Sequence, residues 1–347
     1  MRFLDKVTLR YRNRSDGNVS GYGKLFALAA GFVRSLRGAM SEAPQITLIS
    51  WIMVGVLAFV WGGTFLVTEV ALTGMPPFWL AASRIGFAAV VMVLIWGARG
   101  FALFQARAGG GTWGNMLCIG IGSSALPFAL LAWGQQYVTA GFAGVSMASV
   151  ALLVLPLAHF FVPGERLSLR KVLGFVIGFV GVVVLIGTQA FDSTGGKLET
   201  PGRLACLAAA ASYAVCSVLL RRLPPVDPIG LSTVLLIIGA AVAIPLALIV
   251  EGPPPMPTPY IFSVLAFLGL IPTAAANFLR VLVVRTAGPV FMSLVNYMVP
   301  LWSVLLGALI LAEPLPPSLL WAMALILCGV GLSQFGALSR LFRVTRR

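Results

Sequence analysis

The sequence predicts an all-α polytopic membrane protein, with ten transmembrane helices arranged as two inverted five-helix repeats. Three observations support this fold class: an apolar composition, ten apolar runs of spanning length, and a pattern that recurs in the second half. Hydrophobic residues make up 59% of the 347-residue chain and charged residues only 10%, whereas soluble domains carry roughly 25% charged residues. Most of the surface must therefore face lipid. Continuous apolar runs argue against a β-barrel, whose strands alternate in polarity.

The ten expected spans are separated by clusters of proline and glycine, which interrupt helices. A helix needs about 20 apolar residues to cross a hydrocarbon core of about 30 Å. The runs of this length are 49–70, 77–97, 113–134, 139–161, 168–188, 202–221, 229–250, 260–283, 287–311 and 317–336.

The positive charges predict the orientation in the membrane. The net charge is +14, and with the N-terminus inside, arginine and lysine gather in the inner loops and the C-terminal tail. Basic residues resist translocation, so we expect both termini in the cytoplasm and the protein in the inner (plasma) membrane. The same argument accounts for the charge without nucleic acid as a partner.

The chain divides into four expected parts. Residues 1–45 form a basic cytoplasmic extension, 46–190 and 200–336 form the first and second five-helix repeats, and 337–347 form a basic cytoplasmic tail. The extension has no apolar run long enough to span a membrane. One hypothesis is that translation starts at Met40 rather than Met1, which mass spectrometry of the native N-terminus would decide.

The two halves repeat one another in sequence. T-A-G opens both 139–167 and 286–315, Ser146 and Ser149 precede Ser293 and Asn296 by 147 positions, and Glu165 precedes Glu313 by 148. Because five spans is an odd number, the second half enters the membrane from the opposite side. Inverted repeats of this kind are the usual basis of alternating access, with substrate bound between the repeats.

Several stretches resemble the EamA family of the drug/metabolite transporter superfamily. W-G-G-T-F at 61–65 resembles the start of that family, A-A-S-R at 81–84 its second helix, and P-G-E-R-L-S at 163–168 its junction between helices 4 and 5; N-Y-M-V-P at 296–300 and G-A-L-I-L-A-E at 307–313 are similar to the second copy. The resemblance covers residues 46–336. It implies ten helices, inverted repeats and export or exchange of small metabolites such as amino acids.

Polar and aromatic residues at matching positions are the candidate substrate-binding residues. Hydroxyl, amide and aromatic groups suit an amphipathic organic cargo, although polar groups between helices also serve as structural hydrogen bonds. The candidates are Trp61, Thr64, Phe65, Ser146, Ser149, Ser212, Tyr213, Asn277, Arg280, Ser293, Asn296 and Tyr297.

Four charged residues are candidates for gating or structural roles. Arg84 lies about seven residues inside its helix, where a bare cation costs a few kcal/mol. We expect it to reach the outer interface or to pair with Glu69. Glu165 and Glu313 sit at helix breaks, where a carboxylate can cap the following helix or act as a gate; capping is the favoured reading.

No enzyme signature is present, because the sequence lacks metalloprotease, serine-hydrolase and phosphate-loop motifs. The four cysteines form no CxxC pair, so we expect neither a metal site nor a cofactor. The sequence therefore predicts a transporter of small amphipathic metabolites, working by alternating access through a central cavity. The alternatives are a non-transporting sensor or scaffold, and a flippase of lipid-linked head groups. The expected partners are a small-molecule substrate and the lipid bilayer, and a homodimer stays open as an alternative.

Overall fold

The computed structural model describes residues 46–104, 111–161, 168–191, 198–220, 223–224, 226–287, 289–292 and 294–344. The expected extension 1–45 lies outside them. Ile46–Arg347 form one compact unit. Within the described ranges the secondary structure is helical, apart from a single antiparallel bridge between Phe104 and Val226.

Each of the ten expected spans coincides with helical structure. The elements, in chain order, are α3 Leu48–Leu72, α4 Pro77–Ala98, α5 Gly111–Gly120, η1 Ile121–Ala125, α6 Leu126–Gly134, α7 Ala140–Phe161, α8 Leu169–Phe191, α9 Glu199–Leu220, α10 Pro228–Glu251, α11 Pro259–Leu268, η2 Gly269–Ala275, α12 Ala276–Thr286, α13 Pro289–Met292, α14 Val295–Ile310 and α15 Pro317–Val344.

Within the described residues, seven helices are long and apolar enough to cross a membrane, and α14 and the part Pro317–Ser333 of α15 add shorter apolar stretches. This makes the chain a multi-pass membrane protein. The expected ninth span is broken, because Leu294 donates to Phe291 O in a turn between α13 and α14. The tenth continues to Val344, beyond its expected end.

Local sequence explains the helix starts. Thr47 and Ser50 form a capping box at the start of α3. Asp227 caps α10 through the N–H groups of Ile229 and Gly230, and Thr258 caps α11. Proline occupies the first helical position of α4, α10 and α11, where its missing N–H has no helical partner to lose.

Two π-helical segments interrupt the third and eighth predicted spans. The segment η1 joins α5 to α6, and η2, which contains Pro272, joins α11 to α12. A π turn widens the helix and leaves carbonyl groups without their usual donors, and such segments are frequent at functional sites. Both segments lie within their spans rather than at the ends.

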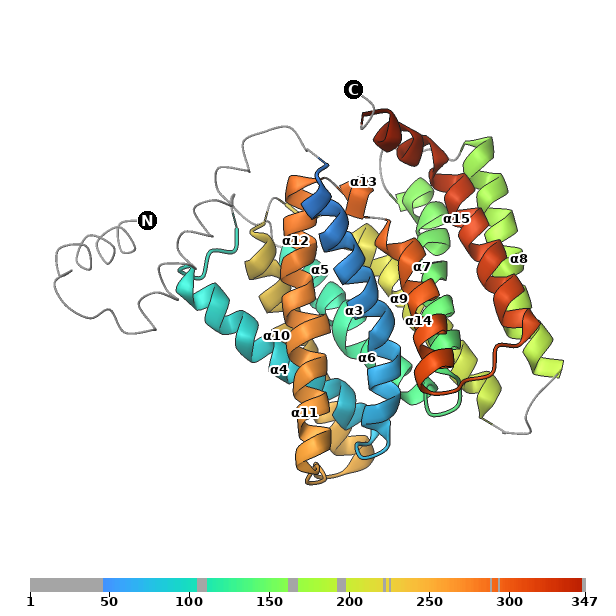
Figure 1. Cartoon of the computed structure of the whole chain (residues 1–347). Coiled ribbons are helices and arrows are strands. Elements are labelled where there is room, and N and C mark those ends of the chain that lie inside the picture. Colours follow the sequence, from blue (N-terminus) through green and yellow to red (C-terminus); the bar gives the residue numbers. More distant parts are fainter. Residues whose placement is uncertain are drawn as a thin grey trace, which may run out of the picture. The chain divides into compact units, whose positions relative to one another are not determined.

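Helices of the first half pack mainly on helices of the second. The pairs are α4 with α10, α3 with α14, α7 with α9 and α14, α6 with α9, α3 with α12, and α8 with α15. In Figure 1, α8 and α15 run side by side at one edge of the bundle. A Cβ on Gly174 of α8 would meet Gly329 O of α15 at 2.5 Å, so these two backbones touch.

Candidate functional site

A buried arginine lies at the centre of the candidate site. Arg84 of α4 is 9% exposed. Its Nε donates a hydrogen bond of 2.8 Å to Thr273 Oγ1 of η2, and its guanidinium carbon lies 4.2 Å from the centre of the Phe128 ring of α6. Helices from both halves of the chain therefore hold the cation in place.

A small cavity of about 20 Å³ adjoins this arginine. That volume holds about one water molecule, so the cavity in this structure is too small for a metabolite. Three helices of the first half, α3, α4 and α6, form its walls. The lining residues are Thr64, Phe65, Thr68, Leu80, Ala81, Arg84, Phe128, Leu131, Ala132 and Gln135.

The polar groups of the cavity wall are mostly satisfied within the protein. Thr64 and Thr68 donate to the carbonyls of Val60 and Thr64, four residues back on their own helix. Gln135 Nε2 donates to Phe65 O at 2.8 Å and so fastens α6 to α3. The arginine remains the one strongly charged group among the residues that line this cavity.

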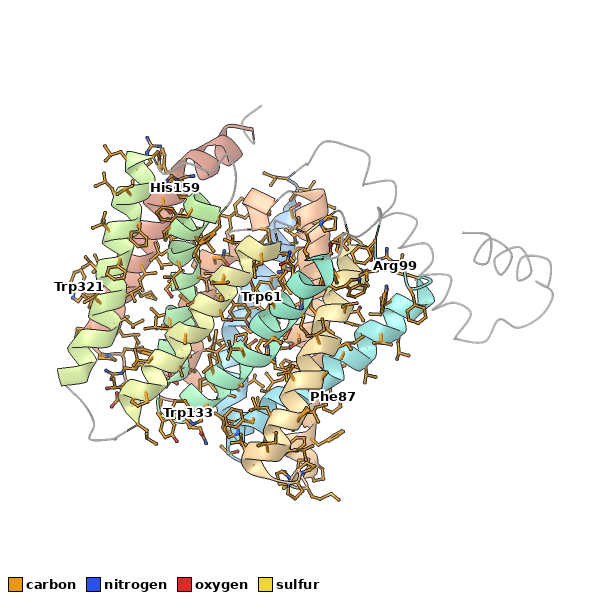
Figure 2. The ribbon with its side chains drawn as sticks, turned by 180° about the vertical axis from the view of Figure 1, so that it is seen from behind. Trp61, Phe87, Arg99, Trp133, His159 and Trp321 are labelled. Carbon is orange, nitrogen blue, oxygen red and sulfur yellow. The ribbon has the colours of Figure 1, made fainter. Side chains whose placement is uncertain are left out.

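Three predicted substrate-binding residues instead hold the π segments. Trp61 Nε1 donates to Pro272 O at 3.0 Å, and Asn277 Nδ2 donates to Thr273 O at 2.6 Å. Ser212 Oγ donates to Gly122 O of η1 at 2.6 Å. Figure 2 shows Trp61 midway between the levels of His159 and Trp133, which lie towards opposite ends of the bundle. These bonds satisfy backbone carbonyls of the two π segments.

The structure does not bring together Ser146, Ser149 and Asn296, which occupy matching positions in the two halves. The two serines are 0% and 1% exposed and donate to carbonyls of their own helix, Ala143 O and Ser146 O. Asn296 lies on an exposed face of α14, and its expected neighbour Ser293 lies outside the described residues. The face of α14 that touches α7 carries Ser303, which fits against Gly144.

Three further candidates have defined surroundings. The Tyr213 side chain lies close enough to Arg84 for the two to interact electrostatically. Tyr297 Oη is buried without a hydrogen-bond partner among the described residues. Arg280 is partly buried in α12, and no ion pair joins it to any described residue.

The expected pairing of Arg84 with Glu69 is wrong. Arg84 points to Thr273 and Phe128, whereas the Glu69 carboxyl group lies within hydrogen-bond reach of Glu313. The physical reason is that η2 of the second half lies against α4 and offers Arg84 a hydroxyl partner. The outer-interface alternative fails too, because the side chain is buried.

The expected cap by Glu313 on the following helix is also corrected. Its two oxygens accept from the N–H groups of Ala140 and Gly141, at 2.6 and 3.0 Å, and so cap α7 of the first half. Glu251 does the same for α4, accepting from Phe78 and Trp79 at 3.0 and 2.9 Å. Glu165 lies outside the described residues.

A second, larger cavity of about 340 Å³ lies between α7, α8 and α9. Its walls are apolar apart from Ser149, whose hydroxyl bonds to its own helix. This cavity offers no free polar group to orient a metabolite.

Sequence reasoning missed four residues of the arginine site: Thr68, Phe128, Gln135 and Thr273. Thr68 follows Thr64 by one helical turn, and Phe128 and Thr273 each follow a proline of the third and eighth spans. Those prolines are the signal that could have found them.

These features define the class first: a multi-pass membrane protein with a buried charged site between its helices, a combination that marks transport pathways. The model of the EamA-like transporter family matches residues 48–187 and again 200–334. The chain belongs to this family and is a membrane transporter of that type.

The relatives carry transporter names. The "Uncharacterized transporter YoaV" of Bacillus subtilis (strain 168) is 24% identical over 290 residues, 82% of this chain and 97% of that protein. A "Probable amino-acid metabolite efflux pump" of Salmonella typhimurium is 30% identical over 49% of this chain and 52% of that one. The "Aromatic amino acid exporter YddG" of Ancylobacter novellus is 29% identical over 49% and 58%.

A solved crystal structure has the same fold. It matches with a TM-score of 0.60 and 24% identity, over 83% of this chain and 98% of that chain.

Proposed function

We propose that the protein exports or exchanges small amphipathic metabolites by alternating access, with the cargo bound at the cavity beside Arg84. The observation that carries this proposal is the meeting of both halves at that point: α3, α4 and α6 line the cavity, and Thr273 of η2 holds its cation. A transporter needs its site where its moving parts meet.

We further propose that residues 46–190 and 200–336 are inverted repeats. If the halves are copies, α3 corresponds to α9, α7 to α14, and α6 to α12. The contact between α3 and α14 then corresponds to the contact between α9 and α7, and the contact between α6 and α9 to the contact between α12 and α3. All four contacts are present. The π segments η1 and η2 also lie in corresponding spans of the two halves. This reciprocity supports two copies of one unit.

The caps support a gate at the end of the bundle where α4 and α7 begin. Glu251 and Glu313 from the second half each hold the N-terminus of a first-half helix. The distribution of lysine and arginine supports our proposal that this end is extracellular, with both termini in the cytoplasm; we propose the inner membrane as the location. Opening the cavity outward requires these four hydrogen bonds to break.

Amino acids are the cargo that the relatives suggest. Two of them carry names that refer to amino-acid export, and an amino acid combines a charged group with an apolar side chain, as the cavity wall does.

Uptake and efflux of radiolabelled amino acids by proteoliposomes would test the proposal, with protein-free liposomes as the control. We expect saturable flux of at least one amino acid. A sensor or scaffold would give none across the panel, and a flippase would move a fluorescent lipid-linked head group instead; either result would refute the proposal.

A further inference from the structure

We propose that Arg84 binds the carboxylate of the cargo, which makes the substrate class small organic acids and amino acids with an apolar remainder. This inference rests on the proposed transport function and specifies its substrate. It follows from the position of the cation, from the absence of a carboxylate partner in the described part of the chain, and from the walls of the cavity.

At the position of Arg84, an unpaired cation has a high free-energy cost. It lies seven residues into α4, about 10 Å along the helix from its start at a rise of 1.5 Å per residue. A charge inside a membrane costs several kcal/mol unless it reaches water or a partner. With 9% exposure and its Nε bonded across to η2, this side chain does not extend to the interface.

The described part of the chain gives Arg84 no carboxylate. Each acidic side chain there has contacts elsewhere: Glu199 pairs with Arg203 and Asp227 with Arg99. The remaining three are Glu69, which faces Glu313, and Glu251 and Glu313, which cap α4 and α7. The guanidinium is therefore available for an anion from outside the protein.

The contacts of Arg84 fix its orientation and leave the N–H groups of its two terminal nitrogens available. Thr273 takes the Nε–H, and the Phe128 ring supports the guanidinium from one side. Among the described residues, no hydrogen bond occupies the two terminal nitrogens, and the residue lines the cavity. A carboxylate binds such a planar fork through two parallel N–H···O bonds.

The rest of the cavity selects the remainder of the cargo. Phe65, Leu80, Phe128 and Leu131 present apolar surface beside the cation. An organic cation would be repelled by the guanidinium, and a neutral polar molecule would accept weaker hydrogen bonds from it than a carboxylate does. The cavity must widen to admit such a cargo, since its present volume of about 20 Å³ holds about one water.

Thermal unfolding of the purified protein in detergent tests this inference with three probes of one shape: 3-phenylpropionate, 3-phenylpropan-1-ol and 3-phenylpropylamine. We expect only the carboxylate to raise the melting temperature of the wild type. Arg84→Gln should weaken the apparent affinity at least about tenfold, because a charge-assisted pair becomes a neutral one, and Arg84→Lys should keep part of it. If Arg84→Gln does not fold, the comparison of the three probes on the wild type still decides.

Arg170→Gln is the matched control. Arg170 also lies over a phenylalanine ring, 5.0 Å from the Phe335 centroid, but on an exposed part of α8. This variant should respond to 3-phenylpropionate like the wild type. Equal stabilisation by all three probes, or by the amine alone, would overturn the inference, as would an undiminished carboxylate response in Arg84→Gln.

Flux separates this inference from the proposed function. Carboxylate flux that is lost in Arg84→Gln supports both. Flux of amines without carboxylates leaves transport standing and refutes the carboxylate site. Stabilisation by the carboxylate without flux of any probe or amino acid supports the site and refutes transport.

Discussion

The two cross-repeat caps, Glu251 on α4 and Glu313 on α7, should respond differently to the same substitution. Both carboxylates accept two backbone N–H groups at 2.6–3.0 Å. Glutamine replaces one acceptor oxygen with an NH₂ group, so one bond is lost and the other becomes neutral. With about 1.5–3 kcal/mol for a charge-assisted bond and 0.5–1.5 for a neutral one, Glu251→Gln should cost about 3 kcal/mol.

Glu313→Gln should cost much less, because Glu69 faces Glu313. Two carboxyl groups in contact repel one another unless they share a proton. The Glu69 Oε2 atom is buried without a hydrogen-bond partner in the described structure, and the new NH₂ group would supply the missing donor. That gain offsets most of the lost cap and leaves a net loss of about 0–1 kcal/mol.

The assay is thermal unfolding in detergent, combined with a double-mutant cycle. Glu251→Gln should lower the melting temperature by several degrees, and Glu313→Gln by clearly less. In a Glu69→Gln background there is no carboxylate repulsion for Glu313→Gln to relieve, so Glu313→Gln should then cost as much as Glu251→Gln. Equal losses from Glu313→Gln in both backgrounds would show that Glu69 and Glu313 are not coupled and would refute the reasoning.

Three other predictions concern the site and the packing. Arg84→Met removes a buried cation that has no carboxylate partner among the described residues, so the melting temperature without ligand should stay level or rise. A marked drop would mean that Arg84 is structural. Trp61→Phe loses the bond to Pro272 O and should cost about 1 kcal/mol, measured by thermal unfolding; no change would mean that this bond contributes nothing to stability. Gly174→Leu places a side chain where Gly329 O lies 2.5 Å from an added Cβ, so it should separate α8 from α15 and reduce the protection of their amides in hydrogen exchange. Gly114→Leu is the control, because a Cβ at Gly114 has open space around it, and it should not change the protection.

The positions of the helices were predictable from sequence, but their partners were not. Apolar runs ended by proline located α4 and α10 to within one or two residues, because helix termini depend on local chemistry. Glu313 was correctly expected to cap a helix, yet it caps α7 and not the helix that follows it. Nothing local in 139–167 or 307–315 says which N-terminus lies beside Glu313, since that depends on the packing of α14 against α7.

The site was recovered in part for the same reason. Thr64 and Phe65 were expected as substrate-binding residues and Arg84 as a gating or structural charge, and all three line one cavity. Asn296 and Ser146 repeat at the right interval but do not meet, because α14 turns Ser303 towards α7 and leaves Asn296 exposed. Spacing along a helix fixes which residues share a face and leaves open which face the neighbouring helix covers.

The position of the Arg84 side chain depends on the π-helical conformation of η2, because Thr273 of this segment accepts its hydrogen bond. A π turn holds one residue more than the α turn it replaces, and each residue of an α-helix turns the chain by about 100°. If Gly269–Ala275 tightened into ordinary α-helix, the chain beyond it would rotate by about that angle, and Thr273 would leave Arg84. The side chains of Trp61 and Asn277 donate hydrogen bonds to carbonyls of this same segment, so they stabilise its π-helical conformation. In the winding seen here, Thr273 holds the guanidinium of Arg84 at the cavity.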